Sequence, residues 1–207
     1  MEHIVDLDSW PRADQFRFFR TYDRPHYAIT SRMDVTHLMA RKADGISTYR
    51  ASLYAIGAGL HAVPELCMRF RGDTVVRHDA IDLSMTVPRA GGSFGYAYVP
   101  WQVDFAGFDR VCADLIAEAA KGTVLNANTG QTDAVAYASC MPWLDYTSLN
   151  NALPGAHDCI PRVSWGKFCD HGARWDMAMT LEVHHALVDG QQVGAYFSAV
   201  QGALNEV

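Results

Sequence analysis

The chain is 207 residues long, with 49% hydrophobic and 19% charged residues, a composition that fits one globular domain over residues 1–207 with a sizeable core. The formal net charge of −6 and the lack of any basic run exclude a typical nucleic-acid surface. No apolar stretch approaches the roughly 18 residues of a membrane span, and the first residues lack a signal pattern, so we expect a soluble, cytoplasmic protein without a membrane partner.

The spacing of apolar residues predicts a series of helices and strands. In chain order we expect a strand at 26–33, a helix after Asp34, a helix at 48–62, strands at 66–71, 74–77, 83–88 and 93–99, a helix at 108–121, strands at 134–140, 161–165 and 176–184, and a helix at 191–205. Asp34 is a typical N-cap for the helix that follows it. Pro64 ends the helix at 48–62. Gly72-Asp73 predicts a hairpin turn, and Gly122 a helix stop.

The order of these elements predicts an α+β fold, a two-layer α/β sandwich in which helices cover one large mixed or antiparallel sheet. A doubly wound nucleotide-binding fold is disfavoured, because no predicted strand leads into a Gly-rich phosphate loop. Residues 126–132 predict a polar loop, and residues 144–160 predict an irregular wall rather than one long regular element.

Cysteine and histidine are spaced without a metal-binding pattern. The five cysteines are odd in number and lack CxxC spacing, which fits reduced thiols better than a disulfide framework. Cys159 and Cys169 lie near His157 and His171, but at no familiar ligand spacing, so we expect no metal.

The last predicted strand and helix meet in the segment Val183-His184-His185-Ala186-Leu187-Val188-Asp189-Gly190. Along the strand, one set of alternate residues points one way (Met177, Met179, Leu181, Val183) and the other set points the opposite way (Ala178, Thr180, Glu182, His184). Such a corner can hold an imidazole at the edge of a pocket, where it can take a proton from a hydroxyl. His-His-x-x-x-Asp-Gly is therefore a catalytic hypothesis. The alternative is a polar cap followed by an ordinary Asp-Gly turn.

Five separated motifs stand out along the chain: Trp10-Pro11-Arg12, Phe16-Arg17-Phe18-Phe19, Thr30-Ser31-Arg32-Met33-Asp34-Val35-Thr36, Ser139-Cys140-Met141-Pro142-Trp143 and the His-His corner. With these motifs the chain resembles the chloramphenicol acetyltransferase family along nearly its full length. The resemblance implies a CoA-dependent acyltransferase fold, acetyl-CoA as co-substrate, and a homotrimer with active sites at subunit interfaces.

The resemblance also implies roles for individual residues. His185 matches the general base that removes the proton of the acceptor hydroxyl, so that its oxygen attacks the acetyl thioester directly. Ser139 matches the serine that stabilises the tetrahedral oxyanion. Asp189 matches an aspartate that pairs with an early arginine, here Arg12, and holds the corner in shape, and His184 is expected to be structural.

Further matches concern binding. The residues at acceptor-pocket positions are Phe19, Phe94, Leu149 and Ser164. The residues at coenzyme positions are Tyr49, Lys167 and Phe168.

The expected reaction is acetyl transfer from acetyl-CoA to a hydroxyl of a small molecule, with chloramphenicol as the leading acceptor. One alternative keeps this chemistry on another alcohol, which the polar pair Asn150-Asn151 beside Leu149 favours. A second is an idle trimer that binds a small apolar ligand, although such a module has no need of His185 and Ser139 together. A third, a zinc hydrolase using the His pair, would need further ligands that the sequence does not show.

Overall fold

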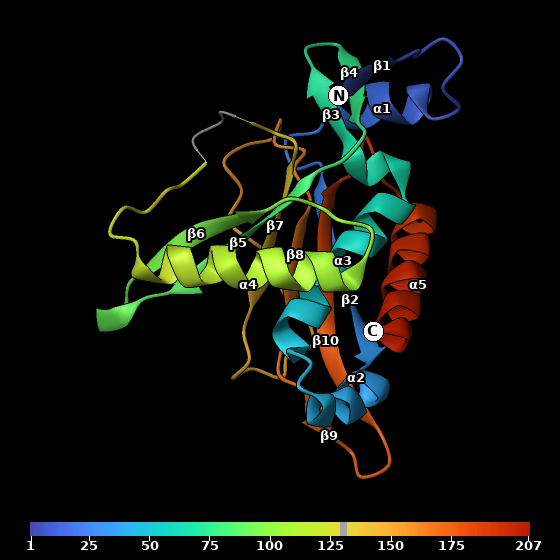
Figure 1. Cartoon of the computed structure of the whole chain (residues 1–207). Coiled ribbons are helices and arrows are strands. Elements are labelled where there is room, and N and C mark those ends of the chain that lie inside the picture. The colour runs from blue at the N-terminus through green and yellow to red at the C-terminus, as the bar shows by residue number, and fades with distance from the viewer. Residues whose placement is uncertain (129–131) are drawn as a thin grey trace.

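The computed structural model describes residues 1–128 and 132–207, so the central part of the predicted 126–132 loop lies outside the described residues. A seven-stranded mixed sheet dominates the fold, with one short strand, β9, paired to the side of β10 (Figure 1). In spatial order the strands are β2 (His26–Asp34), β10 (Trp175–His184), β8 (Arg162–Trp165), β7 (Val135–Cys140), β5 (Asp82–Pro88) and β6 (Phe94–Val99), with β9 (Cys169–Asp170) beside β10. The pairs β5–β7 and β7–β8 are parallel, and the other pairs are antiparallel.

A second, three-stranded sheet lies at one end of the molecule (Figure 1). It consists of β1 (Glu2–Val5), β4 (Thr74–His78) and β3 (Met68–Arg71). The predicted hairpin at Gly72-Asp73 is confirmed, since Arg71 pairs with Thr74 and Gly72 has a φ of +60°. The β3 strand begins later than predicted because residues Pro64–Cys67 form the 3-10 helix η2.

Four helices begin and end close to the predicted positions: α2 (Thr36–Arg41), α3 (Thr48–Ala62), α4 (Phe105–Lys121) and α5 (Gly190–Glu206). A further helix, α1 (Ala13–Phe19), was not predicted, and 3-10 turns form η1 (Lys42–Asp44) and η3 (Ala90–Gly92). The α4 helix starts three residues earlier than predicted because Asp104 caps it, accepting a hydrogen bond from the Gly107 N–H. The structure places Val35 rather than Asp34 at the N-cap of α2, although the Asp34 carboxylate still accepts from the Thr36 N–H at 2.9 Å.

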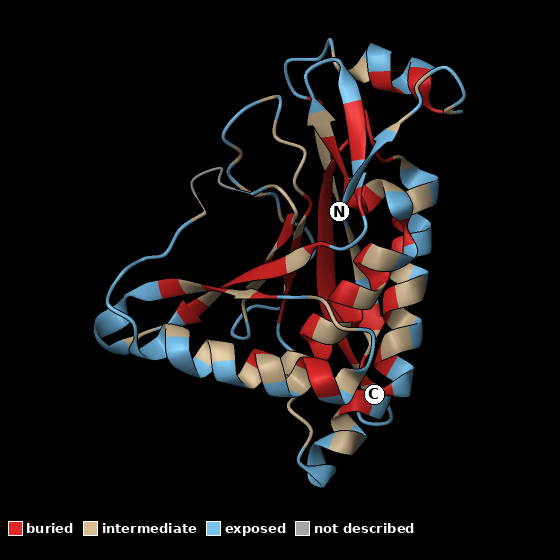
Figure 2. Cartoon of the chain, turned by 45° about the horizontal axis from the view of Figure 1, so that its top comes forward, coloured by how far each residue is buried: buried red, intermediate tan, exposed pale blue. Residues whose placement is uncertain are grey.

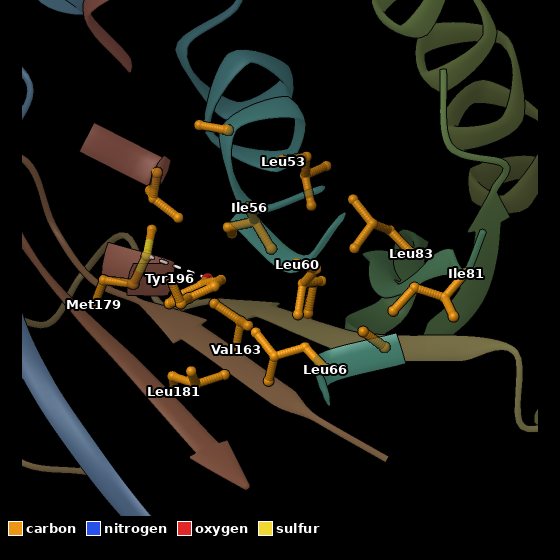
Figure 3. Close-up of a cluster of buried hydrophobic side chains, with 14 of the residues drawn as sticks. Leu53, Ile56, Leu60, Leu66, Ile81, Leu83, Val163, Met179, Leu181 and Tyr196 are labelled. Atoms are coloured by element: carbon orange, nitrogen blue, oxygen red, sulfur yellow. Dashed lines mark hydrogen bonds between the residues drawn. The ribbon is translucent and has the colours of Figure 1, made fainter. Parts of the chain in front are cut away.

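Helices α3, α4 and α5 lie on one face of the large sheet, and their inner sides are buried while their outer sides are exposed (Figure 2). The core between these layers contains Leu60 of α3, Tyr196 of α5 and Leu181 of β10 (Figure 3). Each of these side chains is fully buried, and each such burial stabilises the fold by roughly 1.5–3 kcal/mol. The fold is therefore the predicted two-layer arrangement of helices on a large mixed sheet.

The strand β10 shows that both faces of the sheet are covered at its centre. Every residue from Asp176 to His184 is buried, not only alternate ones. Leu181 faces the helices, whereas its neighbour Thr180 faces the irregular segment that follows β7, where the hydroxyls of Thr180 and Tyr146 lie 3.3 Å apart. In the same segment the side chain and backbone N–H of Asn151 both donate to Glu182 at 2.7 Å. The predicted irregular wall at 144–160 is confirmed as the cover of this second face.

The face of the sheet turned away from the helices is polar. One row of paired residues crosses it: Tyr98, Ser84, Tyr137, Arg162 and Glu182. A second row consists of two paired parts, Tyr96 with Thr86, and Ser139, Ser164, Thr180 and Thr30. The intervening positions, such as Leu83 and Val163, are apolar and face the helices. None of the described helices is long and apolar enough to cross a membrane.

Candidate active site

The His-His corner is built where β10 ends and α5 begins. Asp189 is the N-cap of α5, and its carboxylate accepts from the Gln191 N–H at 2.9 Å. The side chain of Gln192 accepts in return from the Asp189 N–H at 3.2 Å, which completes a capping box. The predicted turn is thus also the start of the last helix, and its geometry is fixed from both sides.

An ion pair from the other end of the chain holds this corner. The buried guanidinium of Arg12 donates to the Asp189 carboxylate and, through Nε, to the Leu187 carbonyl at 3.2 Å. Burial by itself would raise the pKa of Asp189, but the Gln191 N–H and Arg12 hold that pKa below its ordinary value. The carboxylate is thereby kept ionised and committed to Arg12 and the helix cap, and no contact joins it to the His185 ring.

Both ring nitrogens of His184 are used in structural hydrogen bonds. Its Nδ1 accepts from the Ala186 N–H at 3.1 Å, so Nε2 carries the proton and donates to the Ala156 carbonyl at 2.9 Å. Burial, together with the neighbouring His26, lowers the pKa of His184 to about 4. His184 is therefore a neutral ring that ties the corner to the irregular segment.

The next ring, His185, is held by packing. It stacks on Phe19 at a centroid distance of 3.8 Å with 7° between the planes, and Tyr27 lies 4.7 Å away on a tilted plane. The His185 backbone N–H donates to the Pro25 carbonyl at 2.9 Å. Its Nδ1 is buried without a hydrogen-bond partner among the described residues, and the residue as a whole is half-buried. The ring is thus held in a rigid aromatic seat.

Tyr27 is a residue of this corner that the sequence did not reveal. Burial, reinforced by the charge of Asp189, raises the pKa of Tyr27 to about 12, so its hydroxyl stays protonated near neutral pH. That hydroxyl donates to the Val188 carbonyl at 3.3 Å. The period-2 pattern of residues 26–33 places Tyr27 on a strand, but it cannot show that β2 runs beside the end of β10.

Ser139 lies elsewhere, in a cavity of about 350 Å³ on the polar face of the sheet. Ser164, which is buried, pairs with Ser139 across β7 and β8 and lines the same cavity. The remaining walls come from β5 and β6, the segment near Asn128, and the irregular segment, and include Ser84, Thr86, Tyr96, Tyr98, Tyr137, Asn151 and Arg162. Strand alternation could indicate which of these share a face, but not that the face encloses a cavity.

A larger cavity of about 900 Å³ contains the residues predicted for the coenzyme. Tyr49, Lys167 and Phe168 line it, together with Phe94, which was predicted for the acceptor pocket. The Tyr49 ring lies 5.6 Å from the Trp165 ring, and burial raises the pKa of Tyr49. The predicted acceptor residue Leu149 lines neither cavity and is half-buried in the irregular segment.

The two cavities meet at β7 and β8. Thr86 lines both, and Ser139 and Ser164 in the smaller cavity are followed directly in the chain by Cys140 and Trp165 in the larger one. Burial raises the pKa of Cys140 to about 12, so that its thiol is protonated near neutral pH and is not a nucleophile. The two cavities therefore share a wall at Thr86.

His185 and Ser139 are well separated within one chain. Ser139 pairs with Ser164, which pairs with Thr180, and His185 follows Thr180 by five positions. At about 3.3 Å per residue along a strand, this places them on the order of 15 Å or more apart. The predicted catalytic residues thus form two groups, with His185, Asp189, Arg12 and Phe19 in one and Ser139 and Ser164 in the other.

No group of three or more His, Cys, Asp or Glu side chains among the described residues is arranged to hold a metal ion. The absence of a metal requirement stays a prediction. Without such a group, nothing in the described part of the chain supports a zinc hydrolase.

The family model described as chloramphenicol acetyltransferase matches residues 2–201. The chain belongs to this family. A chloramphenicol acetyltransferase of Bacillus pumilus is 24% identical over 192 residues, covering 91% of this chain and 87% of that protein. A solved chloramphenicol acetyltransferase structure is 25% identical, with a TM-score of 0.87, and covers 99% of this chain and 100% of its own.

The fold extends beyond this family. A probable dihydrolipoamide acetyltransferase of Listeria monocytogenes, only 15% identical, aligns with a TM-score of 0.68 over 94% of this chain and 89% of that protein. That likeness shows a shared acyltransferase fold and carries no argument about the acceptor.

Proposed function

We propose that this acetyl-CoA-dependent O-acetyltransferase moves the acetyl group to a hydroxyl of a small molecule, with chloramphenicol as the first acceptor to test. Membership of the chloramphenicol acetyltransferase family supports the reaction class. The observation that carries the proposal is the position of Ser139, where a polar cavity meets a larger one of about 900 Å³. An acceptor and a thioester can approach each other there.

We further propose that the active unit is a homotrimer and the whole chain one acetyltransferase domain. One chain does not bring His185 to Ser139, so the pair must be completed by a second copy. In this arrangement Nε2 of His185 on one subunit faces the Ser139 cavity of its neighbour. The exposed rings of Phe18 and Tyr22, which pack edge-on against Phe19, give the His185 side an apolar surface suited to such a contact. A cytoplasmic location stays a prediction.

The reaction needs one proton acceptor and one oxyanion donor. Nε2 of His185 takes the hydroxyl proton as the acceptor oxygen bonds to the acetyl carbon. The Ser139 hydroxyl donates to the oxyanion of the tetrahedral intermediate. The carbon–sulfur bond then breaks, the carbonyl re-forms, and the sulfur takes the proton from His185 and leaves as the free thiol of CoA. No covalent acetyl-enzyme is required, in keeping with the protonated thiol of Cys140.

In this mechanism Asp189 and Arg12 act as positioning residues. Their ion pair and the helix cap fix the segment that carries His185, while the carboxylate remains ionised throughout. Removing one member of a fully buried pair typically costs about 3–5 kcal/mol, because the other charge is left without a partner. Asp189 is 34% exposed, so solvent screens its charge and the loss here should be smaller.

The first experiment is an assay of purified protein with acetyl-CoA and chloramphenicol that follows release of the free CoA thiol. His185→Ala should lower kcat by about 10²–10⁴-fold, the usual contribution of a general base. His37→Ala, at an exposed histidine of α2, is the matched control and should leave the rate unchanged. An unchanged rate for His185→Ala would contradict the assignment of His185 as the general base. If no thiol is released with chloramphenicol, other alcohols become the next acceptors to test.

The same assay tests the shared site. Chains carrying His185→Ala and chains carrying Ser139→Ala should each be nearly inactive alone. Refolded together, they should regain activity, since mixed trimers contain sites with an intact His185 and an intact Ser139. Mixtures no more active than the separate variants would contradict a site built between subunits.

A further inference from the structure

Most of the residues that line the cavity beside Ser139 carry hydrogen-bonding side chains. Hydroxyl and amide groups reach it from β5, β6, β7 and β8 and from two neighbouring loops, in the form of Ser84, Thr86, Tyr96, Tyr98, Asn128, Tyr137, Ser139, Asn151 and Ser164. Small-molecule cavities are usually lined by apolar side chains with only a few polar groups. This wall mixes polar and apolar surface and is much more polar than the wall of the larger cavity, which suits a ligand that carries several hydroxyl groups.

Two polar atoms of this wall, Oγ of Ser84 and Oδ1 of Asn128, are buried without a partner among the described residues. Ser84 is almost fully buried, and its Oγ has no hydrogen-bond partner of good geometry among the described residues, although it lies close enough to the Tyr98 hydroxyl to offset part of the rise that burial causes in the Tyr98 pKa. Leaving a buried hydroxyl unsatisfied costs about 1–3 kcal/mol, so a ligand hydroxyl that bonds to it would be favoured. Ser84 stands next to Tyr98 on one side and Tyr137 on the other, in the middle of the polar row. It is thus a hydrogen-bonding position for whatever fills the cavity.

The positive charge of Arg162 in the cavity wall is neutralised by a carboxylate of the same chain. Arg162 donates to the Asp158 carboxylate at 2.5 Å and to the Ile160 carbonyl at 3.1 Å, and its guanidinium lies 5.2 Å from the Tyr137 ring centre. The nearby carboxylate of Glu182 is bonded to Asn151. Because the single cation of the wall already has its counter-ion, the cavity does not call for a charged ligand.

The tyrosines add flat surfaces to these polar groups. The Tyr98 hydroxyl donates to the Asn126 carbonyl at 2.9 Å, and the Asn128 side-chain amide lies 3.4 Å from the Tyr137 hydroxyl. Both rings are therefore held in place at their hydroxyl ends. A fixed tyrosine presents an apolar face and a polar tip, which suits a ring with C–H groups on its faces and hydroxyls on its rim.

From these observations we propose that the acceptor is a neutral, polyhydroxylated ring compound of monosaccharide size, such as a glycoside. The proposal rests on the proposed function and names the acceptor class of the same site. A cavity of about 350 Å³ is at the lower end of the range for small ligands, roughly 300–1,000 Å³. One hydroxyl lies at Ser139 and is acetylated, its proton passing through His185 to the CoA thiol. The other hydroxyls bond to Ser84 and to its tyrosine neighbours.

The test compares acceptors in the thiol-release assay with acetyl-CoA. The neutral arm contains methyl glucoside, methyl galactoside and methyl mannoside, the charged arm contains glucuronic acid and glucosamine, and chloramphenicol is the apolar reference. We expect at least one neutral glycoside to have a kcat/KM about tenfold or more above both chloramphenicol and the charged sugars. Mass spectrometry of the product should show one added acetyl group.

Variants of the cavity wall separate a specific site from general reactivity. Ser84→Ala should raise the KM for the preferred glycoside about tenfold with little change in kcat, because it removes a binding contact and no reacting group. Combining Ser84→Val with Tyr98→Phe should shift the ratio of kcat/KM values toward chloramphenicol. Ser198→Ala, on the exposed side of α5, is the matched control and should change neither ratio nor KM.

Each outcome has a separate meaning. Acetylation of chloramphenicol ahead of every glycoside, with no effect of Ser84→Ala on acceptor choice, overturns the acceptor proposal and leaves the proposed function in place. Faster acetylation of the charged sugars overturns the neutrality of the acceptor. Failure to acetylate any acceptor, by protein that binds acetyl-CoA, overturns both the acceptor proposal and the proposed function.

Discussion

The two faces of the large sheet are built on opposite principles. The face toward α3, α4 and α5 carries Leu, Val and Met side chains that are fully buried against the helices. The other face carries two rows of hydroxyl and charged groups beneath an irregular segment. Since both faces belong to the same strands, the protein places most of its packed core on one side of the sheet and the cavity that contains Ser139 on the other.

This division explains why the polar face can hold a cavity. An apolar layer packs to high density and excludes voids, whereas paired polar groups can be satisfied by a ligand or by solvent. The helix side thus holds strands β5, β7 and β8 in register while the other side stays open around Ser139. Substitutions on the two faces should therefore affect different quantities.

The sharpest test of this division is Ser139→Ala. Loss of one oxyanion donor should lower kcat by about 10²–10³-fold, with little change in the acceptor KM, because the bond strengthens in the transition state. The free energy of unfolding should hardly change, since Ser139 is only partly buried. Thiol-release kinetics and denaturant unfolding measure the two quantities. A selective rise in KM would instead make Ser139 a ground-state contact.

A smaller effect is expected from consecutive residues that face opposite sides. Leu181 and Thr180 are both fully buried on β10. Leu181→Ala leaves a cavity among Leu60, Tyr196 and their neighbours and should lower the free energy of unfolding by about 3 kcal/mol. Thr180→Val keeps the volume but loses hydroxyl contacts to Thr30 and Tyr146, at a cost of about 1 kcal/mol.

Urea unfolding monitored by tryptophan fluorescence measures both variants of this pair. Equal decreases in the free energy of unfolding for Leu181→Ala and Thr180→Val would contradict the view that the helix side carries most of the stability. A larger decrease for Thr180→Val would mean that the polar side carries more of it.

The alternation along residues 176–184 predicted which side chains share a face, and the structure confirms that division for Leu181 and Thr180. Other features could not be read from the sequence, because they depend on distant segments meeting. Arg69 is fully buried and donates only to backbone carbonyls, including those of Asp133 and Val135 at the start of β7. Arginine is rarely found so deep, and nothing in its local sequence indicates this role.

The candidate site shows the same limit. The motifs marked Ser139 and His185, but sequence spacing gives neither their separation within one chain nor the aromatic seat of His185 on Phe19. Likewise, alternation places Ser84 and Tyr98 on one face without showing what covers it. The roles of these residues stay predictions until the variants are measured.

A further effect concerns pH and the end of β10, where His184 lies on the polar face of the sheet. Burial, with a contribution from His26, lowers the pKa of His184 from 6.5 to about 4. Above pH 6.5 the ring is neutral in both the folded and the unfolded chain. As pH falls from 6.5 toward 4, only the unfolded chain takes up the proton, so stability is lost, by about 2 kcal/mol at pH 5.

Replacing His184 by Gln isolates this contribution, because the amide can still donate to the Ala156 carbonyl but does not titrate. The facing groups are His26, Asp158 and Arg20, and they remain in both proteins. His61, whose pKa burial also lowers, keeps part of the pH dependence in the variant. Urea unfolding between pH 7 and pH 4.5 should therefore show a shallower loss of stability for His184→Gln than for the unaltered chain. If stability falls equally with pH in both proteins, then His184 is not a neutral ring that links β10 to the irregular segment. The hydrogen bonds from Asn151 to Glu182 would then be the contacts that join these two parts.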